Sequence, residues 1–413
     1  MSDDGRHPLT ADAELRRRAR RVIPGGLYGH QNVAFLPAGY PQFFRSGLGA
    51  RLWDVDGNEY IDLMCSYGPV LLGHRHPHVE QAAARQAADG DCLNGPTPRL
   101  VELAEALVAV VDHADWAIFS KNGTDATTQC LTIARAATGK RKVLVAAGAY
   151  HGAAPWCTPI PSGVVAEDRA HLITYRYNDL ASVDAALAEA GDDLAAVVVS
   201  PIRHDIGVDL ALPDPAFAAG LRAACDRAGA ALILDDVRCG LRLHHGGSWE
   251  PLGIRPDLSA WSKAIANGYA LGAVLGTEAL AEAARSIYTT GSFWFAAVSM
   301  AASLATLQVL DEQDIVGRTV KIGTLLRQGL AEQAAGRGLP VTLSGPVQMP
   351  FLTFADDPDF ARAETFARVA VGGGVYLHPR HNWFVSGAMD EADVDRVLAV
   401  TDGAFDAVLA ARG

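Results

Sequence analysis

The stretch "PDLSAWSKAIANGYALGAVLG", residues 256–276, places a lysine at the end of an apolar run and shortly before a segment that contains several glycines. Of the 35 lysine and arginine residues in the chain only five are lysines, so Lys263 stands out in a sequence that otherwise uses arginine. Arginine stays protonated in proteins, whereas a buried lysine amine can lose its proton. The position of Lys263 therefore predicts a buried amine with a chemical role.

Apolar runs on both sides of Lys263 predict the fold. From about residue 98 onward, short apolar runs alternate with helical stretches over 124–138, 180–190 and 214–229. The runs are "WAIFS", "KVLVAA", "HLITY", "AAVVVS", "ALILDD" and "LSAWS". This alternation indicates an α/β fold with a mostly parallel sheet that helices cover on both faces. In such sheets, ligands bind at the carboxyl ends of the strands.

The two ends of the chain have a different pattern. An amphipathic helix is expected over about 11–22, and "ARLWDVDGNEYIDL" predicts two strands joined by a tight Asp56–Gly57 turn. Beyond about residue 300, an alanine-rich helix precedes four strand-like segments, "VTLSG", "PFLTFA", "GVYLHP" and "NWFVSG". We expect these segments to form a smaller α+β lobe against which the N-terminal segment packs.

Composition narrows the class of partner. The chain has 413 residues, 49% of them hydrophobic, and a formal net charge of -12, which argues against nucleic acid or an anionic membrane. The six cysteines form no CxxC pair, so no metal site or disulfide framework is predicted. The charged N-terminus has no apolar signal core. A cytoplasmic protein that binds small molecules is the expectation.

Polar residues follow three of the predicted strands. In "FSKNGTDATTQC" the helix start after Gly123 and the Thr124 hydroxyl can hold a phosphate, although an ordinary N-cap explains the same residues. Asp235 and Asp236 end another strand, as cofactor ligands or as a solvated terminus. With Lys263, 28 residues after Asp235, they predict pyridoxal 5'-phosphate (PLP). The lysine would form the Schiff base, the carboxylate would hold the pyridine nitrogen protonated, and the helix start would anchor the phosphate.

The chain resembles the class-III aminotransferases of fold type I, and especially their glutamate-1-semialdehyde aminomutase branch. The motifs that carry the resemblance are "IPGG", "LWDVDGNEYIDL", "SYGPVLLGHRHP", "NGTDA", "AYHG", "LDDVRCGLR", "PDLSAWSKAIANG" and "SLATLQVL". The resemblance implies a large domain with a mostly parallel seven-stranded sheet and a smaller α+β domain. It implies an N-terminal segment over 1–55, a PLP-binding domain over 56–300, a C-terminal domain over 301–413, and a homodimer with an intersubunit active site.

The same resemblance implies roles for individual residues. Lys263 would bond to the cofactor and move protons, Asp235 would contact the pyridine nitrogen, and Val237 and Tyr150 would cover the two ring faces, although both also fit ordinary core positions. Ser292, which also fits a turn, aligns with a threonine that reaches the phosphate of the neighbouring subunit. The implied catalytic residues are Lys263, Asp235 and Tyr150, and the implied cofactor-binding residues are Asn122, Gly123, Thr124, Tyr150, His151, Asp235, Val237, Lys263 and Ser292.

Departures from the aminomutase pattern concern the substrate. Gly29 and Asn32 stand where aminomutases carry a serine and an arginine that hold the substrate, so the carboxylate clamp is absent. "SPIRHD" replaces a Glu-Pro step and brings Arg203 and His204 toward the cofactor ring oxygen, unless it is a solvated loop. This polar entrance indicates a hydroxylated or cationic substrate, as in the similar aminotransferases of aminoglycoside biosynthesis. The substrate candidates are Tyr28, His30, Asn32, Arg203 and His204.

The resulting expectation is a PLP-dependent aminotransferase with ping-pong kinetics. Glutamate or glutamine would donate the amino group to an aldehyde or ketone of a polar acceptor, such as an amino sugar, that is not an α-keto acid. An aminomutase or epimerase that uses the same lysine is one alternative, and a binding protein that keeps the fold without catalysis is another. Whether Arg203, Arg242 or Arg380 contacts a donor carboxylate is open at this point.

Overall fold

The computed structural model describes residues 6–411, and the chain divides into two compact units. One unit is Pro77–Val316, and the other combines Met1–His76 with Gly317–Gly413. They are called here the seven-stranded unit and the four-stranded unit, after their main sheets. These limits, defined by compactness, differ from the domain limits at 55 and 300 implied by resemblance, which stay a prediction.

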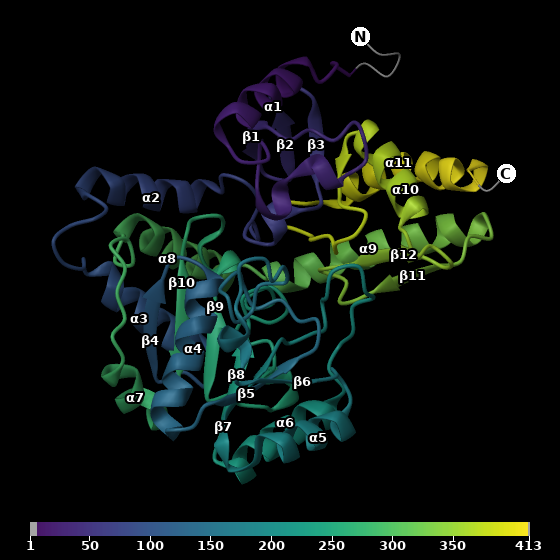
Figure 1. The fold of residues 1–413 in the computed structure, drawn as a ribbon. Coiled ribbons are helices and arrows are strands. Elements are labelled where there is room, and N and C mark those ends of the chain that lie inside the picture. Colours follow the sequence, from purple (N-terminus) through teal and green to yellow (C-terminus); the bar gives the residue numbers. More distant parts are fainter. Residues whose placement is uncertain (1–5, 412–413) are drawn as a thin grey trace. The chain divides into compact units, whose positions relative to one another are not determined.

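A seven-stranded sheet forms the centre of the first unit (Figure 1). Its spatial order is β4 (Trp116–Ser120), β10 (Gly272–Gly276), β9 (Leu258–Trp261), β8 (Ala231–Asp235), β7 (Leu194–Val199), β5 (Lys142–Ala146) and β6 (Leu172–Tyr175). Only β10 runs antiparallel to its neighbours, whereas the other paired strands are parallel. The predicted α/β fold with a mostly parallel seven-stranded sheet is confirmed.

Helices bury both faces of this sheet. Along β7, Val197 packs with α5 (Leu180–Ala190) and α6 (Pro215–Ala228), whereas Val198 packs on the other face with α4 (Gly123–Thr138). Successive side chains of a strand point to opposite faces, so a strand buried on both sides reads as a continuous apolar run. This is why all six predicted strands of this unit were recognisable from sequence. The three predicted helical stretches are also present.

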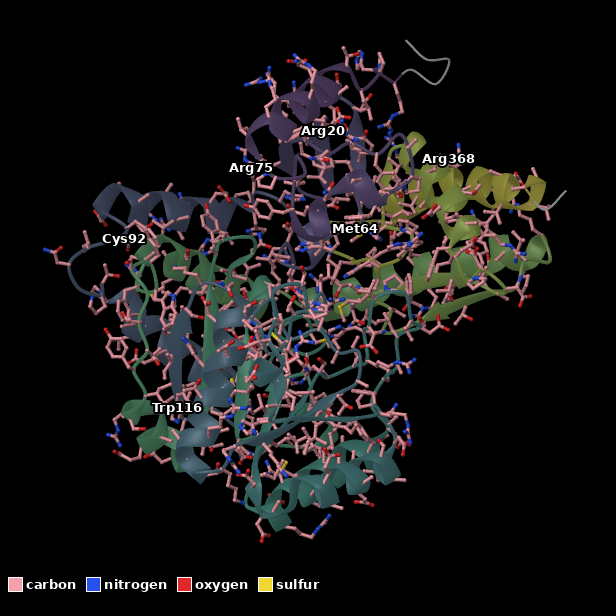
Figure 2. All side chains as sticks on the ribbon, viewed as in Figure 1. Arg20, Met64, Arg75, Cys92, Trp116 and Arg368 are labelled. Carbon is pink, nitrogen blue, oxygen red and sulfur yellow. The ribbon has the colours of Figure 1, made fainter. Side chains whose placement is uncertain are left out.

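The sequence pattern did not predict strand β10, because a glycine stands at each of its ends. A Cβ on Gly276 would lie 2.1 Å from the ring of Trp116, so the absence of a side chain there lets the indole cover the strand end. Trp116 is labelled in Figure 2. The Trp116 indole N–H donates to the Thr277 carbonyl oxygen at 2.8 Å. The remaining helices of the unit are α2 (Pro77–Asp89), α3 (Arg99–Val110), α7 (Ala281–Ser286) and α8 (Ala297–Glu312).

The four-stranded unit has an antiparallel meander joined by one parallel strand. Its order is β1 (Phe44–Leu48), β2 (Arg51–Asp54), β3 (Glu59–Asp62) and β13 (Val375–Tyr376), beside a separate hairpin of β11 (Val341–Ser344) and β12 (Phe351–Phe354). Its helices are α1 (Thr10–Val22), α10 (Ala361–Gly372), α11 (Glu391–Ala410) and nearly all of α9 (Ile315–Gly336). The helix near 11–22 and the hairpin that turns at Asp56–Gly57 are confirmed.

One predicted strand of this unit is absent. "NWFVSG", residues 382–387, forms no strand, because its backbone N–H groups bond to separate segments. Trp383 donates to the Pro350 carbonyl, Phe384 to the Leu63 carbonyl and Gly387 to the Leu71 carbonyl. An extended segment held by several partners in this way cannot form a continuous ladder with any one of them.

Short 3-10 helices connect many of these elements. They are η1 (Gly29–Gln31), η2 (Val33–Phe35), η3 (Cys65–Tyr67), η4 (Ala166–Arg169), η5 (Gly191–Asp193), η6 (Glu250–Leu252), η7 (Lys263–Ala266) and η8 (Glu278–Leu280). All six cysteines are free thiols. Cys92, in the connection between α2 and α3, is exposed and is labelled in Figure 2.

Candidate active site

A cavity of about 220 Å³ lies beyond the carboxyl ends of β4, β8 and β9, where a parallel sheet binds its ligands. Nine of the predicted site residues line it: Asn122, Gly123, Thr124, Tyr150, His151, His204, Asp235, Val237 and Lys263. Gly152, Arg238 and Ser262, which sequence reasoning did not select, also line it. All of these residues belong to the seven-stranded unit.

The first turn of α4 forms one end of the cavity. Asn122 is the N-cap, and its Oδ1 accepts a backbone N–H of the first turn at 2.9 Å. A Cβ on Gly123 would come within 2.7 Å of Val237, so only glycine lets the helix start lie this close to that side chain. The Thr124 hydroxyl oxygen accepts the Ala153 N–H at 3.1 Å. Unpaired N–H groups and the helix dipole make this end suitable for a phosphate.

Asp235 ends β8 with its carboxylate held on two sides. Its Oδ2 lies 2.6 Å from Nδ1 of His151, and its Oδ1 accepts the Val237 N–H at 3.2 Å. The His151 ring stacks on Trp156 with centroids 6.1 Å apart. Asp235 is only 5% exposed, so its orientation in the cavity wall is fixed by these contacts. A buried, oriented carboxylate fits a protonated pyridine nitrogen.

The adjacent Asp236 has a different environment. It accepts the Ser248 backbone N–H at 2.9 Å and also the Ser248 hydroxyl, and it does not line the cavity. Burial raises the pKa of Asp236 to about 7, although the Ser248 bonds oppose this shift. The two neighbouring carboxylates therefore differ in function: Asp235 faces the cavity, and Asp236 secures the loop that contains Ser248.

Lys263 begins η7 two positions after the end of β9, in a strained backbone conformation. Its φ of 50° lies in the left-handed region, which costs a non-glycine residue about 1–3 kcal/mol and is common at functional sites. Burial lowers the pKa of Lys263 to about 7, and the positive charge of Arg238 acts in the same direction. An amine that is half neutral near pH 7 can add to an aldehyde, so the helix start, the carboxylate and the lysine together fit PLP.

Tyr150, His204 and Arg238 form another part of the wall. Burial raises the pKa of the half-buried Tyr150 and lowers the pKa of His204 well below its ordinary value. Arg238 is 7% exposed and lies in the turn after Val237. The sequence gives little signal for Arg238, because "LDDVRCGLR" also contains Arg242, which does not line the cavity.

Two predicted residues of this unit lie elsewhere. Arg203 does not line the cavity: it pairs through its backbone with Ala211, and its Nη2 donates to the Asp209 carbonyl oxygen at 2.8 Å. Arg203 closes a small loop in this way, and its contact with the substrate stays a prediction. Ser292 is exposed in the connection between α7 and α8 and does not line the cavity of its own chain.

The other substrate candidates belong to the four-stranded unit. Tyr28 is exposed, and the His30 ring meets the Tyr67 ring edge-on with centroids 4.5 Å apart. The Asn32 side chain has a structural role, because it caps η2 by accepting the Ala34 N–H at 2.9 Å. Arg380 forms an ion pair with Glu364 at 2.6 Å. A carboxylate already neutralises that arginine.

Residues 6–411 contain neither a metal-binding cluster of side chains nor a membrane-spanning helix. No group of three or more histidine, cysteine, aspartate or glutamate residues there could hold a metal ion. Within the same range, no helix combines the length and the apolar character that are needed to cross a membrane.

The sequence is similar to known aminotransferases over nearly its whole length. Residues 37–385 match the family model for aminotransferase class-III. The chain is 49% identical to the aminopentol aminotransferase of Sphingopyxis macrogoltabida, over 97% of this chain and 95% of that protein. It is 35% identical to glutamate-1-semialdehyde 2,1-aminomutase 2 of Brevibacillus brevis, over 93% of this chain and 96% of that protein.

Solved structures agree with the family match. The PLP internal aldimine form of the FumI protein of Sphingopyxis sp. MTA144 superposes with a TM-score of 0.96 at 49% identity and covers 97% of this chain and 96% of that one. An omega-transaminase from Sphaerobacter thermophilus superposes with a TM-score of 0.89 at 27% identity, over 100% of both chains. With its lysine, carboxylate and helix-start cavity, the chain belongs to the class-III aminotransferase family of fold-type-I, PLP-dependent enzymes.

Proposed function

We propose that this aminotransferase moves an amino group between an amine that carries several hydroxyl groups and a 2-oxo acid. The observation that carries the proposal is that Lys263, whose pKa is lowered to about 7, lines the same cavity as Asp235 and the first turn of α4. The substrate class is supported by the 49% identity to an enzyme named for an aminopentol, an amine with five hydroxyl groups. This replaces the aminoglycoside expectation.

Each cavity residue has a proposed task. Bound PLP withdraws electrons from the carbon that bears the amino group, so that a proton on this carbon becomes removable. Lys263 accepts that proton as its neutral amine and returns it later as general acid. Asp235, which His151 orients at 2.6 Å, keeps the pyridine nitrogen protonated. Tyr150 and Val237 cover the ring faces, while Asn122, Gly123 and Thr124 hold the phosphate.

The proposal extends to the assembly and the second substrate. We take the enzyme to be a cytoplasmic homodimer in which Ser292 of one subunit reaches the phosphate bound by the other. Its exposure in this chain supports such a role. We take glutamate or glutamine, and the corresponding 2-oxo acid, as the amino-acid pair. Gel filtration of the purified protein tests the dimer.

A substrate panel tests the reaction. Amino polyols of increasing chain length, beginning with glucamine, are supplied with 2-oxoglutarate or pyruvate, and the amino acid formed is quantified. Hexylamine, which has no hydroxyl group, is the matched control amine, and neamine represents the aminoglycosides. We expect amino polyols to give the highest kcat/KM and initial rates to follow ping-pong kinetics. A preference for hexylamine or neamine would contradict the substrate class.

A second candidate follows from the 35% identity to an aminomutase. In that case the amino group returns to the same molecule and no 2-oxo acid is consumed. Conversion of an amine without any acceptor, and without amino-acid formation, would favour this reading. After the "IPGG" motif, Gly29 and Asn32 stand where aminomutases carry a serine and an arginine that hold the substrate. The loss of these two residues argues against glutamate semialdehyde as the substrate.

A further inference from the structure

Arg238 places a permanent positive charge in the cavity wall. Its side chain is 7% exposed and lines the cavity beside Tyr150, His204 and Lys263. A guanidinium cannot discard its proton to escape the cost of burial, unlike a lysine or histidine. Within the protein the charges of Asp235 and Asp205 favour the charged form of Arg238, and the residue also lines the cavity, where a bound molecule can reach it. None of the roles proposed above for the cofactor uses this residue.

Electrostatic effects locate the guanidinium among the reacting groups. After burial, the charge of Arg238 is the largest influence that lowers the pKa of both Lys263 and His204. It also opposes the raised pKa values of Tyr150 and Asp205. Three of these four groups, Lys263, His204 and Tyr150, line the cavity together with Arg238. Arg242 is fully buried but does not line the cavity.

His204 provides the second, independent observation. It is 6% exposed and lines the cavity, and its Nδ1 has no hydrogen-bond partner among residues 6–411. Burial keeps its pKa well below the ordinary value, so the ring is neutral at physiological pH and offers one donor and one acceptor. Buried nitrogen atoms of this kind are nearly always satisfied, which indicates that a bound molecule supplies the partner.

We propose that Arg238 and His204 form an oxyanion-binding wall, in which Arg238 supplies charge and His204 a neutral hydrogen bond to an anionic oxygen of a bound molecule. The planar guanidinium fork suits such an oxygen because it donates two parallel hydrogen bonds. The oxygen belongs either to the cofactor or to the carboxylate of the amino-acid substrate. The inference rests on the proposed function, since it concerns the molecules which that reaction brings into the cavity.

Two binding measurements on purified protein distinguish these sources. The first is the dissociation constant of PLP from the protein without any substrate. The second is the dissociation constant of glutarate, an unreactive dicarboxylate, from the PLP-loaded protein by calorimetry. Both are measured for wild type, Arg238→Gln and Arg238→Lys. Arg135→Gln is the control, because Arg135 is partly buried on α4 and does not line the cavity.

Each outcome decides the proposal. If the oxygen belongs to the cofactor, Arg238→Gln weakens PLP binding by at least about 10-fold, as expected for loss of a charge-assisted bond. If it belongs to the substrate carboxylate, PLP binding stays within about 2-fold and glutarate binding weakens by at least about 10-fold. If Arg238→Gln melts like wild type and both its dissociation constants stay within about 2-fold of the wild-type values, the proposal is overturned.

Two further variants keep the test decisive. If Arg238→Gln does not fold, Arg238→Lys is compared with wild type instead. This variant keeps the charge and loses the planar fork, so we expect it to weaken binding of the same ligand, PLP or glutarate, by about 3-fold or more. His204→Leu should weaken the same constant as Arg238→Gln, and His204→Gln, which keeps a donor and an acceptor, should restore most of it. Neither binding measurement requires catalytic turnover. If wild type did not catalyse transamination, that result would therefore contradict only the proposed function.

Discussion

Asp12 in the four-stranded unit and Asp235 in the seven-stranded unit are both nearly buried, at 1% and 5% exposure, yet their surroundings differ. Asp12 is bound by Arg16 at 2.6 Å and accepts the N–H groups of Gln42 and Phe43 at 2.8 and 2.9 Å. Asp235 has His151 and one backbone N–H, and it borders a cavity. The protein satisfies the first carboxylate by itself, whereas the second is positioned for a bound molecule.

The same contrast extends to the residues around each carboxylate. Near Asp235, the cavity gathers Lys263 with a pKa lowered to about 7, the neutral His204 and the buried Arg238. Perturbed groups that share a cavity are typical of catalytic sites. Around Asp12, the donors come from α1 and from the segment just before β1, and they fix the N-terminal helix in place. Burial alone therefore does not identify a functional carboxylate, but burial beside a cavity does.

The largest expected effect is from Lys263→Ala. Without the amine, the proton on the substrate carbon has no acceptor, and we expect the rate of amino transfer to fall by at least about 1,000-fold. The measurement is amino-acid formation from an amino polyol under saturating PLP. Circular dichroism and the melting temperature serve as controls for folding. Retention of more than about a tenth of the wild-type rate would remove Lys263 from its proposed task.

A smaller effect is expected from Asp235→Asn, and Asp12→Asn is its matched counterpart. Asp235→Asn removes the charge facing the cofactor, so kcat should fall by about 100-fold while the melting temperature changes little. Asp12→Asn should leave kcat unchanged and lower the free energy of unfolding by about 2 kcal/mol. Thermal melts and initial rates of both variants are compared side by side. The reverse pattern would contradict the distinction between the two carboxylates.

The pH dependence of cofactor capture tests the lowered pKa of Lys263. The apoenzyme binds PLP through the neutral amine, whose fraction rises as the pH passes about 7. We therefore expect the capture rate, followed by stopped-flow absorbance, to rise about tenfold from pH 6 to 8 and then to level off. A rate that keeps rising toward pH 10 would indicate an ordinary lysine with a pKa near 10.5.

The smallest effect concerns Asp236 and stability. Its pKa is about 7 in the folded chain against 3.8 for an unperturbed aspartate, so between these values the folded chain holds a proton that the unfolded chain releases. The contribution of Asp236 to stability is therefore lost as the pH rises from about 4 to 7. Asp236→Asn should lack this loss, which amounts to about 1 kcal/mol or more, in urea titrations at pH 4.5 and 7.5. Parallel pH profiles of the two proteins would contradict it.

Sequence patterns predicted much of the fold because the central strands are buried on both faces. Runs such as "AAVVVS" need apolar side chains at every position, and this requirement leaves a direct trace in the sequence. Strand β10, which has a glycine at each end, left no such trace. Position 276 must be glycine because the indole of Trp116 fills the space of a side chain there. "NWFVSG" had the composition of a strand, but its hydrogen bonds go to several segments. Long-range pairing of this kind is not encoded locally.

Several predicted site residues that share one cavity stand at or near the ends of strands. Asp235 ends β8, and Asn122 and Lys263 stand two positions after the last residues of β4 and β9, so the sheet itself brings them to one cavity. The backbone pairing of Arg203 with Ala211 could not be predicted from the sequence, because it joins the two sides of a loop. Arg238 was overlooked because its importance depends on burial beside Lys263, and sequence spacing alone does not report burial.

The most direct test of the central claim is a single half-reaction. PLP-loaded protein is mixed with one equivalent of an amino polyol in the absence of any 2-oxo acid, and the visible absorbance of the bound cofactor is followed. We predict that the band disappears, that one carbonyl product forms per site, and that added 2-oxoglutarate restores the band, in wild type but not in Lys263→Ala. A band that persists in wild type with every amine, or a carbonyl product that forms only when both substrates are present, would contradict the account.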